Sequence, residues 1–402
     1  MRSRVLSGMR PTGALHLGHY HGALKNWVRL QEQHDCFYFV ADWHALTTHY
    51  EERDVIEKNV YDMVIDWLAA GLDPDKSTIF IQSRLPEHAE LFTLLAMGTP
   101  LSWLERVPTY KDQIDKLKDR DLATYGFLGY PLLQAADILI YKATYVPVGE
   151  DQSSHVELTR EVARRFNHLY GRLGGFEAHV AAALARLPKD DQRYYDKQRK
   201  AFGETGSAEA WGKGEALVRR AAAAIENWTD DQTELLLGHL RGSGKAILVE
   251  PQALHTEVLR LPGLDGTKMS KSYGNAVLMR DEPAEVERKI RGMVTDPARV
   301  RRTDPGNPEK CPVWQFRKVY SDEATRDWVV KGCTTAGIGC LECKQPVIDA
   351  IIKEQQPWRE RAAELTADPK KVHWIVEMGT ERARTVARQT MKDVREAMGL
   401  NY

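Results

Sequence analysis

The chain has no apolar run long enough to cross a bilayer, and its 402 residues include only five cysteines. The first absence argues against a membrane protein, because a spanning helix needs about 20 consecutive apolar residues. The second argues against a disulfide scaffold, which uses a higher density of paired cysteines. The start of the sequence, MRSRVLSGMRPTG, reaches glycine and proline before any apolar stretch, so we expect no signal peptide and a cytoplasmic location.

The sequence also lacks an excess of either charge. It has 56 Lys and Arg residues against 57 Asp and Glu residues, a formal net charge of −1. A general polyanion binder is therefore not indicated, although a local basic face would be enough to bind a nucleic acid. A chain of this length exceeds the usual size of one domain, so we expect two domains or one domain with a large insertion.

Short apolar runs alternate with amphipathic stretches in the first part of the chain. The amphipathic stretches include residues 18–33 and 54–70, which indicate helices. On the same pattern, we predict buried strands at 4–9, 37–42, 77–83 and 145–148. Strands that alternate with helices predict an α/β fold with a parallel sheet, whose ligands bind beyond the carboxyl ends of the strands.

The later part of the chain differs in composition. Residues 171–246 are rich in alanine and charged residues, and from about residue 281 the pattern is helical to the end. We therefore expect four segments: a sheet domain over 1–170, a helical insertion over 171–246, the end of the sheet domain over 247–280, and a helical domain over 281–402.

A glycine-rich segment, SGMRPTGALHLGHYHGAL, follows the first predicted strand. Its glycines permit tight turns just ahead of a helix N-terminus, where polyphosphate is a natural ligand. His16 and His19 are three residues apart, so they lie on one side of the first helical turn and can donate to phosphate oxygens. A plain strand-to-helix connection is the alternative, and the segment alone does not decide between them.

A second polar segment, GLDGTKMSKSYGN at 263–275, carries Lys268 and Lys271 between glycines. Two ammonium groups on a loop of this kind are suited to neutralising a pyrophosphate leaving group when the loop closes. A solvated surface loop is the alternative for any isolated run of lysines and serines.

Together the two segments resemble the signature motifs of the class I aminoacyl-tRNA synthetases. HLGH at 16–19 is similar to the family's HIGH motif, and 268–272 reads KMSKS. The resemblance implies a Rossmann-type catalytic domain in which an amino acid carboxylate attacks the α-phosphate of ATP in line, with Mg²⁺ on the phosphates. It gives catalytic roles to His16, His19, Lys268 and Lys271. It implies ATP contacts from Arg10, Thr12, Gly18, His19, Gly149, Asp151, Lys268, Met269, Ser270, Lys271 and Ser272.

Further segments resemble the tryptophanyl-tRNA synthetases within this class. They are SGMRPTG at 7–13, ADWHALTT at 41–48, TPLSWLERVPTYKDQ at 99–113, GYPLLQAADILIY at 129–141 and VPVGEDQ at 146–152. The resemblance implies that Asp137 accepts the indole N–H, which would disfavour phenylalanine because the acceptor would stay unpaired. It implies a tryptophan site formed by Gly8, His44, Tyr130, Gln134, Asp137, Val146, Val148 and Gln152.

The resemblance also implies a helical anticodon-binding domain at 281–402 and a homodimer that binds tRNA(Trp) across its subunits. Arg10 and Gln134 depart from the residues frequent in tryptophan enzymes, and the insertion is absent from their compact bacterial form. A tyrosyl-tRNA synthetase of the same fold and a tRNA-independent adenylate-forming paralogue therefore stay open as alternatives. An iron–sulfur regulatory protein with an inactive synthetase domain is a third, although intact HLGH and KMSKS argue against inactivity.

Four of the five cysteines lie in the last third of the chain. Four thiolates suit either a tetrahedral zinc ion or a four-iron cluster, and ligand type alone does not choose between them. Cys311, Cys333, Cys340 and Cys343 are separated by 21, 6 and 2 residues. This spacing resembles the C-x22-C-x6-C-x2-C pattern of a tryptophanyl-tRNA synthetase subgroup with a [4Fe-4S] cluster. The resemblance implies such a cluster, with zinc and free thiols as alternatives, and Cys36 is expected to be a core residue.

Overall fold

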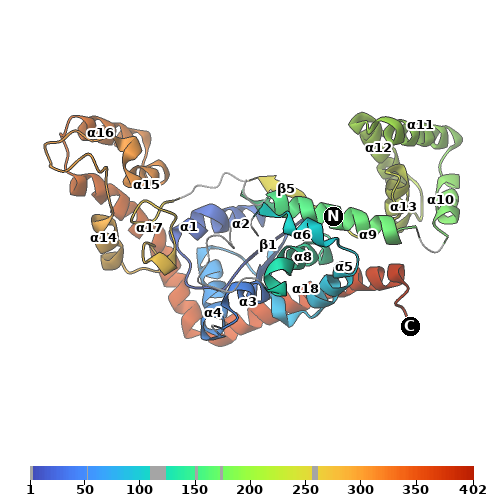
Figure 1. Cartoon of the computed structure of the whole chain (residues 1–402), viewed down its shortest axis with the longest axis horizontal. Coiled ribbons are helices and arrows are strands. Elements are labelled where there is room, and N and C mark those ends of the chain that lie inside the picture. The colour runs from blue at the N-terminus through green and yellow to red at the C-terminus, as the bar shows by residue number, and fades with distance from the viewer. Residues whose placement is uncertain (1–2, 52, 109–123, 150–152, 173–174, 256–260) are drawn as a thin grey trace. The chain divides into compact units, whose positions relative to one another are not determined.

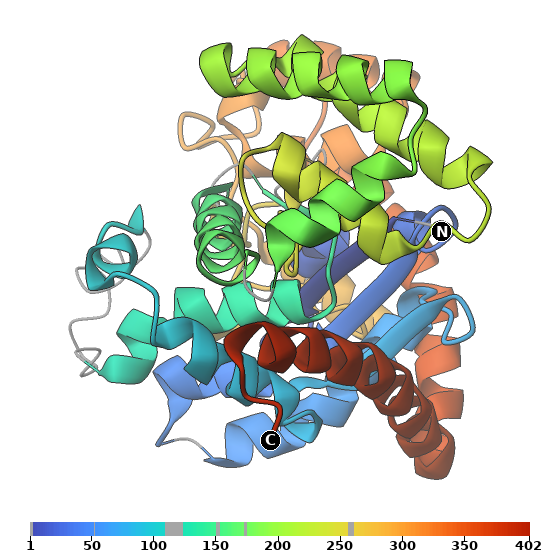
Figure 2. The same ribbon diagram turned by 90° about the vertical axis from the view of Figure 1, so that its right-hand side faces the viewer.

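The strands of the computed structural model form one five-stranded sheet in the order β3-β2-β1-β4-β5 (Figure 1). The model describes residues 3–51, 53–108, 124–149, 153–172, 175–255 and 261–402. The strands are β1 (Arg4–Met9), β2 (Asp35–Val40), β3 (Ser77–Ile81), β4 (Tyr145–Val148) and β5 (Gln252–His255). Strand β2 pairs in parallel with β1 on one side and with β3 on the other (Figure 2). The first four strands were predicted within two residues at each end, whereas the short, partly exposed β5 has no apolar run that would indicate it.

The chain divides into two compact units, each of which is described by itself. The first comprises Met1–Arg84 and His255–Arg382, and the second comprises Leu85–Leu254 and Ala383–Tyr402. The four segments expected from the sequence stay a prediction, because this division follows contacts rather than chain order. No helix in the described part of the chain is long and apolar enough to span a membrane.

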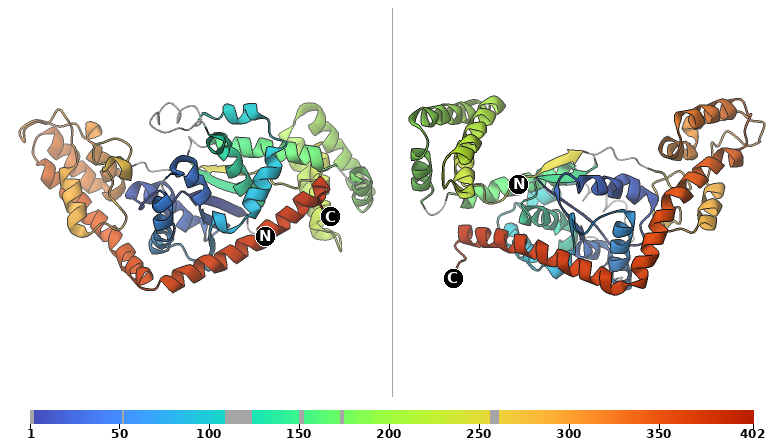
Figure 3. Two further views of the ribbon diagram at one scale, coloured as in Figure 1. Left: turned by 60° about the horizontal axis from the view of Figure 1, so that its bottom comes forward. Right: turned by 180° about the vertical axis from the view of Figure 1, so that it is seen from behind.

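The first unit combines strands β1 to β3 with helices from both ends of the chain. In it, α17 packs against α4, α14 and α15. These helices and turns are α1 (Leu17–His19), the π-helical turn η1 (Tyr20–Leu24), α2 (Lys25–Leu30), α3 (Asp42–His49), α4 (Arg53–Ala70), η2 (Gln82–Arg84), η4 (Lys271–Tyr273), α14 (Pro283–Gly292), η5 (Pro308–Lys310), α15 (Pro312–Tyr320), α16 (Glu323–Thr334), α17 (Cys340–Ala367) and the start of α18 (Pro369–Met398). The bend between α17 and α18 lies at Asp368, because the following proline disfavours helical backbone there (Figure 3).

Aromatic side chains and a close backbone approach hold the first unit together. The ring of Trp27 on α2 stacks on Tyr38 of β2 at 4.5 Å and meets Trp67 of α4 edge-on at 5.3 Å. All three side chains are buried. Gly379 of α18 lies directly against the backbone of Ile79 in β3, so a Cβ at this position would overlap the Ile79 carbonyl group. The start of α18 therefore packs on the edge strand through a residue that has to be glycine.

The second unit contains a helical bundle and the elements that carry it. The bundle has its own core, built from buried side chains of four helices that lie together in Figures 1 and 2. The described helices of this unit are α5 (Glu87–Ala96), α6 (Leu101–Glu105), α8 (Tyr125–Ile140), α9 (Ser153–Tyr170), the end of α18, and the four of the bundle, α10 (Phe176–Ala185), α11 (Lys189–Thr205), α12 (Ala208–Ala224) and α13 (Asp230–Leu240).

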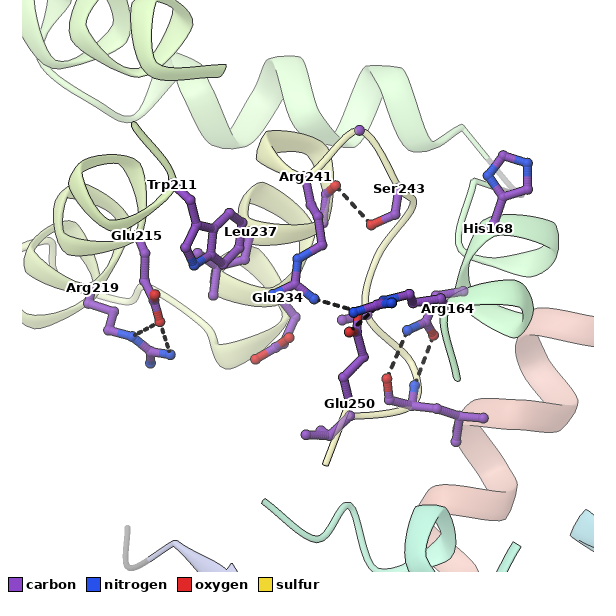
Figure 4. Close-up of a pocket in the computed structure, with 16 residues that line it drawn as sticks. Arg164, His168, Trp211, Glu215, Arg219, Glu234, Leu237, Arg241, Ser243 and Glu250 are labelled. Atoms are coloured by element: carbon purple, nitrogen blue, oxygen red, sulfur yellow. Dashed lines mark hydrogen bonds and ion pairs between the residues drawn. The ribbon is translucent and has the colours of Figure 1, made fainter. Parts of the chain in front are cut away.

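Polar contacts join the bundle to α9. The Asn167 side chain accepts from the backbone N–H groups of Ile247 and Leu248 at 2.9 and 3.0 Å and donates to the Leu248 carbonyl at 2.8 Å. Nearby, Glu250 bridges Arg164 and Arg241, at 2.8 and 2.7 Å, along a pocket of about 410 Å³ (Figure 4). Residues 247–250, which follow the bundle in the chain, are therefore held against α9 by Asn167 and Arg164.

The Gly379 contact predicts a stability effect. Replacing Gly379 with alanine places a methyl group against backbone that cannot rotate away, so we expect Gly379→Ala to lower the free energy of unfolding by about 1 to 3 kcal/mol. The matched control is Gly212→Ala on the exposed side of α12, where an added Cβ meets nothing within 4 Å and helix propensity favours alanine. Denaturant unfolding measures both, and equal stability of the two variants would contradict the packing argument.

Candidate active site

Backbone hydrogen bonds join the segment around HLGH to the segment that follows KMSKS. Leu17 N donates to the Val277 carbonyl and Met279 N donates to the Leu15 carbonyl, each at 2.9 Å. His16 and Leu278 thereby form an antiparallel bridge. The two motifs, about 250 residues apart in the sequence, are held beside each other by the main chain.

A buried carboxylate supports both strands of this bridge. Asp66 of α4 accepts from the Leu15 backbone N–H at 3.4 Å and pairs with Arg280 Nε at 2.6 Å. Burial raises the pKa of Asp66 to about 6, although Arg280 opposes the rise. Asp66 therefore holds Leu15, which lies just before HLGH, and Arg280, which lies just after the bridge.

The two histidines of HLGH bind each other's backbone. His16 N donates to His19 Nδ1 at 3.2 Å, His19 N donates to His16 Nδ1 at 3.3 Å, and the rings stack at 3.7 Å. Because each Nδ1 accepts a hydrogen bond, each neutral ring carries its proton on Nε2. Gly18 permits this arrangement, since a Cβ there would lie 3.0 Å from the His16 ring. The pair thus offers two Nε2–H donors.

Both histidines are neutral at physiological pH. Burial lowers the pKa of His16 to about 4, with a further contribution from Lys268. Burial lowers the pKa of His19 to about 3, and His16 and Lys268 add to the effect. The rings therefore act as hydrogen-bond donors without formal charge, and the positive charge nearby comes from Lys268.

The KMSKS loop places its two lysines on the surface beside the first glycine-rich segment. Lys268 and Lys271 are exposed, while Met269 between them is buried. A Cβ on Gly13 would lie 3.0 Å from Lys271 Cδ, so the Lys271 side chain runs along that glycine. The structure therefore brings together the four residues for which the sequence predicted catalytic roles.

Asn275 organises the KMSKS loop from within. Its Oδ1 accepts from Ser270 N at 2.7 Å, and its Nδ2 donates to Asp265 Oδ1 at 2.9 Å and to the Lys268 carbonyl at 3.1 Å. The side chain is buried. This role of Asn275 was not predicted, although the dipeptide Gly-Asn at 274–275 is a sequence signal for a turn, and Gly274 is in fact left-handed.

In the second unit, one face of α8 carries three predicted tryptophan-site residues, Tyr130, Gln134 and Asp137. Gln134 Oε1 bonds His155 Nδ1 at 2.7 Å, and the Tyr130 ring lies 5.7 Å from that of His155. These positions are separated by four and three residues, which is the spacing of one helix face. His155 is a neighbour that the sequence analysis did not identify.

Asp137 belongs to a fully buried hydrogen-bonded chain. His88 Nδ1 lies 2.6 Å from Asp137 Oδ1, and His88 Nε2 lies 2.6 Å from the Tyr141 hydroxyl. Burial and the nearby Asp137 raise the pKa of Tyr141 well above its ordinary value, so Tyr141 keeps its proton. A chain in which Tyr141 O–H donates to Nε2 and Nδ1–H donates to Asp137 satisfies all three groups. His88 and Tyr141 were missed, because His88 lies on α5, 49 and 53 residues from Asp137 and Tyr141 in the sequence.

The other predicted site residues lie near the carboxyl ends of strands. In the first unit, Gly8 packs against the Phe39 ring, Arg10 and Thr12 are exposed after β1, and His44 is buried in α3. In the second unit, Val146 and Val148 are buried in β4, and Gly149 follows them. Asp151, Gln152 and the side chain of Ser272 lie outside the described residues.

The four C-terminal cysteines share one region of the first unit. Interaction between the thiol groups couples Cys311 with Cys333, Cys333 with Cys340, and Cys343 with both Cys311 and Cys333. Burial is the main cause of the raised pKa of Cys311, Cys333 and Cys343. Across the described part of the chain, however, no three His, Cys, Asp or Glu side chains are grouped so that they could hold a metal ion.

Two buried arginines face these cysteines. Arg299 Nη1 lies 3.9 Å from Cys333 Sγ, and Arg317 Nη2 lies 3.7 Å from Cys343 Sγ. The Nε atoms of both arginines are buried without a hydrogen-bond partner. The other guanidinium nitrogens have acceptors, since Arg299 Nη2 donates to the Arg302 and Ile338 carbonyls and Arg317 Nη1 donates to Ser321 Oγ, and Arg299 also interacts electrostatically with Asp296. Two buried guanidinium groups beside the thiols favour an anionic group in this region. Cys36, by contrast, is buried in β2, as predicted.

Comparison with known proteins identifies the family. A family model described as tRNA synthetases class I (W and Y) matches residues 1–192 and 231–355. The chain belongs to this family. The class I model leaves out residues 193–230, which contain most of α11 and all of α12, and residues 356–402, which contain the end of α17 and all of α18.

Similar members of the class I family are tryptophan enzymes. The tryptophan–tRNA ligase of Ralstonia nicotianae is 63% identical over 399 residues, covering 99% of each chain. That of Thermotoga maritima is 44% identical and covers 99% of this chain and 100% of the relative. The crystal structure of tryptophanyl-tRNA synthetase from Campylobacter jejuni complexed with ADP and tryptophan aligns with a TM-score of 0.71 at 28% identity, covering 98% and 99% of the two chains.

These findings confirm the predicted family and its Rossmann-type fold with a C-terminal helical domain. The iron–sulfur subgroup and the individual roles of the site residues stay predictions.

The depressed histidine pKa values predict a pH-dependent stability. Because His19 stays neutral in the folded protein down to about pH 3 but is protonated in the unfolded chain below about pH 6.5, stability falls as the pH drops below 6.5. We expect His19→Gln to reduce this dependence by up to about 1.4 kcal/mol per pH unit. Denaturant unfolding between pH 7.5 and 5 measures the slope, and parallel curves for the two proteins would refute the assignment.

Proposed function

We propose that this chain is a tryptophan-activating enzyme that couples ATP and L-tryptophan to tryptophanyl-adenylate and pyrophosphate, then transfers tryptophan to tRNA(Trp). The observation that carries the proposal is that main-chain hydrogen bonds join HLGH to the segment that follows KMSKS, in a chain whose relatives of 63% and 44% identity are tryptophan–tRNA ligases. The Campylobacter jejuni structure, complexed with ADP and tryptophan, supports an adenine nucleotide and tryptophan as ligands.

In the activation step, a tryptophan carboxylate oxygen bonds to the α-phosphorus of ATP while the bond from that phosphorus to the bridging oxygen breaks. The electron pair leaves with pyrophosphate, so the enzyme needs no nucleophile and acts by positioning and charge stabilisation. We assign the Nε2–H groups of His16 and His19 to phosphate oxygens. Lys268 and Lys271 supply the positive charge that stabilises pyrophosphate, and Mg²⁺ neutralises further phosphate charge.

For selection of the amino acid, we assign Asp137 to the indole N–H. A carboxylate fixed by His88 and Tyr141 is held in one orientation, and its burial makes an unpaired acceptor costly. Tyr130, Gln134, His44, Val146, Val148, Gly8 and Gln152 complete the proposed tryptophan site. Arg10, Thr12, Gly18, Gly149, Asp151, Met269, Ser270 and Ser272 complete the proposed ATP site.

The transfer step joins the activated carbonyl to a ribose hydroxyl of tRNA, with AMP as the leaving group. We propose that the helices over 281–402 form the anticodon-binding domain, that the enzyme acts in the cytoplasm, and that it functions as a homodimer. The tyrosine-specific reading has less support, because the relatives described above are tryptophan enzymes. A tRNA-independent paralogue would have no use for this helical domain.

The proposal predicts tryptophan-dependent ATP–pyrophosphate exchange. We expect exchange with tryptophan and none with tyrosine, and we expect Lys271→Met to reduce kcat by about 100-fold, because it removes charge from the pyrophosphate and keeps side-chain length. The matched control is Lys213→Met, an exposed lysine of α12 that pairs with Glu209, which should keep wild-type exchange.

If the protein catalysed exchange with tyrosine and not with tryptophan, its amino acid substrate would be tyrosine, and the tryptophan assignment would be wrong. Exchange with neither amino acid would refute the activation step itself. Equal activity of Lys271→Met and Lys213→Met would refute the role given to the KMSKS lysine.

We propose in addition that Cys311, Cys333, Cys340 and Cys343 hold a [4Fe-4S] cluster. Four cysteine thiolates on a four-iron cluster carry net negative charge, which the partly unsatisfied guanidinium groups of Arg299 and Arg317 would offset. Bound there, a cluster would tie the start of α15 to the start of α17. Zinc is the alternative, since four thiolates also satisfy its tetrahedral geometry.

Metal analysis of anaerobically purified protein tests the cluster. We expect about four iron atoms per chain and a broad absorption band near about 400 nm, both lost in Cys343→Ser. Cys36→Ala is the matched control, because Cys36 is buried in β2 and should leave the iron content unchanged. About one zinc per chain would select the alternative, and wild-type protein without either metal would refute both.

A further inference from the structure

A partly buried polar cluster outside the predicted site joins His21, the residue after HLGHY, to two C-terminal helices. His21 Nε2 lies 2.8 Å from the Tyr320 hydroxyl and 3.2 Å from Glu354 Oε2. Tyr320 donates to the same Glu354 oxygen at 2.7 Å. Tyr320 is the last residue of α15, and Glu354 lies in the middle of α17. The three side chains form a closed triangle of hydrogen bonds.

The geometry fixes the direction of these bonds. Burial and the nearby Glu354 raise the pKa of Tyr320 well above its ordinary value, so its hydroxyl keeps the proton that it donates to Glu354. His21 Nε2 then acts as a donor towards the Tyr320 oxygen and the Glu354 carboxylate. His21 Nδ1 is buried without a partner. We therefore place the ring proton on Nε2, where it is donated, and leave Nδ1 as an unpaired acceptor. A single tautomer therefore satisfies the cluster.

His21 lies in a segment of unusual backbone geometry. The chain leaves α1 after His19, forms the π-helical turn η1, and resumes as α2 at Lys25. A π turn inserts extra backbone into a helix, and each residue of helix corresponds to about 100° of rotation. The orientation of HLGH relative to α2 therefore depends on keeping this turn.

A second contact holds the same turn. The Tyr20 ring packs against Trp358 of α17 at 4.2 Å between centroids, one helical turn beyond Glu354. Tyr20 and His21, the first two residues of η1, thus hold the start of the turn against one face of α17. No part of this cluster belongs to the ATP or tryptophan contacts assigned above.

We propose that His21 is a positioning residue for ATP: through Tyr320 and Glu354 it holds the π-helical turn that orients His16 and His19 towards the phosphates. The inference rests on the ATP site of the proposed function. Loss of the hydrogen bonds would let the turn relax towards regular helix and rotate the two histidine donors away from their common side, while tryptophan contacts from α8 would not change.

Three variants test the proposal. Tyr320→Phe removes one hydroxyl, His21→Leu removes the donor and keeps bulk, and His21→Gln returns an N–H donor near the position of Nε2. We expect the first two to weaken MgATP binding about tenfold, because small displacements of positioned groups have large effects. We expect His21→Gln to recover most of this loss. Equilibrium dialysis with MgATP measures Kd on the free protein, and pyrophosphate exchange gives KM for ATP and for tryptophan.

The matched control is Tyr195→Phe, which removes a buried hydroxyl that donates to the Leu236 carbonyl at 2.6 Å within the helical bundle. It should lose stability to a similar degree in thermal unfolding and keep wild-type Kd for MgATP. Equal ATP affinity of wild type, His21→Leu and Tyr320→Phe, or an equal loss in Tyr195→Phe, would overturn the proposal. Weakened MgATP binding in a protein that shows no tryptophan exchange would refute the proposed function and leave the role of His21 standing.

Discussion

The candidate site depends on a bridge between two distant pieces of main chain. The hydrogen bonds of Leu17 with Val277 and of Met279 with Leu15 hold the HLGH turn beside the loop that carries the lysines. Backbone hydrogen bonds between extended segments fix register as well as distance, because a shift by one residue would turn each side chain to the opposite face. Asp66 below the bridge binds one group on each side. The relative placement of donors and cations therefore starts from the main chain and from the Asp66–Arg280 pair.

Within the candidate site, the buried histidines of HLGH are uncharged and the exposed lysines of KMSKS carry the positive charge. Burial keeps His16 and His19 neutral, so they can face each other at 3.7 Å without repulsion and without a ligand. The ammonium groups of Lys268 and Lys271 are exposed, where water stabilises their charge. If both histidines were also protonated, four positive charges would lie close together and repel one another in the absence of phosphate. Neutral donors inside and exposed cations outside avoid that repulsion.

The sequence predicted those parts of the protein that depend on local pattern. Four strands are continuous apolar runs, and HLGH and KMSKS are contiguous motifs, so both were recognisable before the structure. Strand β5 was not, because it is short and partly exposed. His88 and His21 were also missed, since each acts through partners that are distant in the sequence and that folding brings near. His21 and Glu354, for example, are 333 residues apart. A single histidine in a sequence carries no sign of such a partner. Asn275 was missed although its partners lie within ten residues of it.

The first unit is built from two stretches of chain, Met1–Arg84 and His255–Arg382, and this order has a consequence for biosynthesis. Strands β1 to β3 leave the ribosome early, but Gly379, which packs on β3, follows about 300 residues later. At about 5 to 20 residues per second, the wait is on the order of 15 to 60 s. Until then the exposed edge of β3 and the apolar surface that α17 will cover are available to other chains. Nascent chains of this enzyme should therefore require chaperone protection of their N-terminal strands, long after those strands have been made.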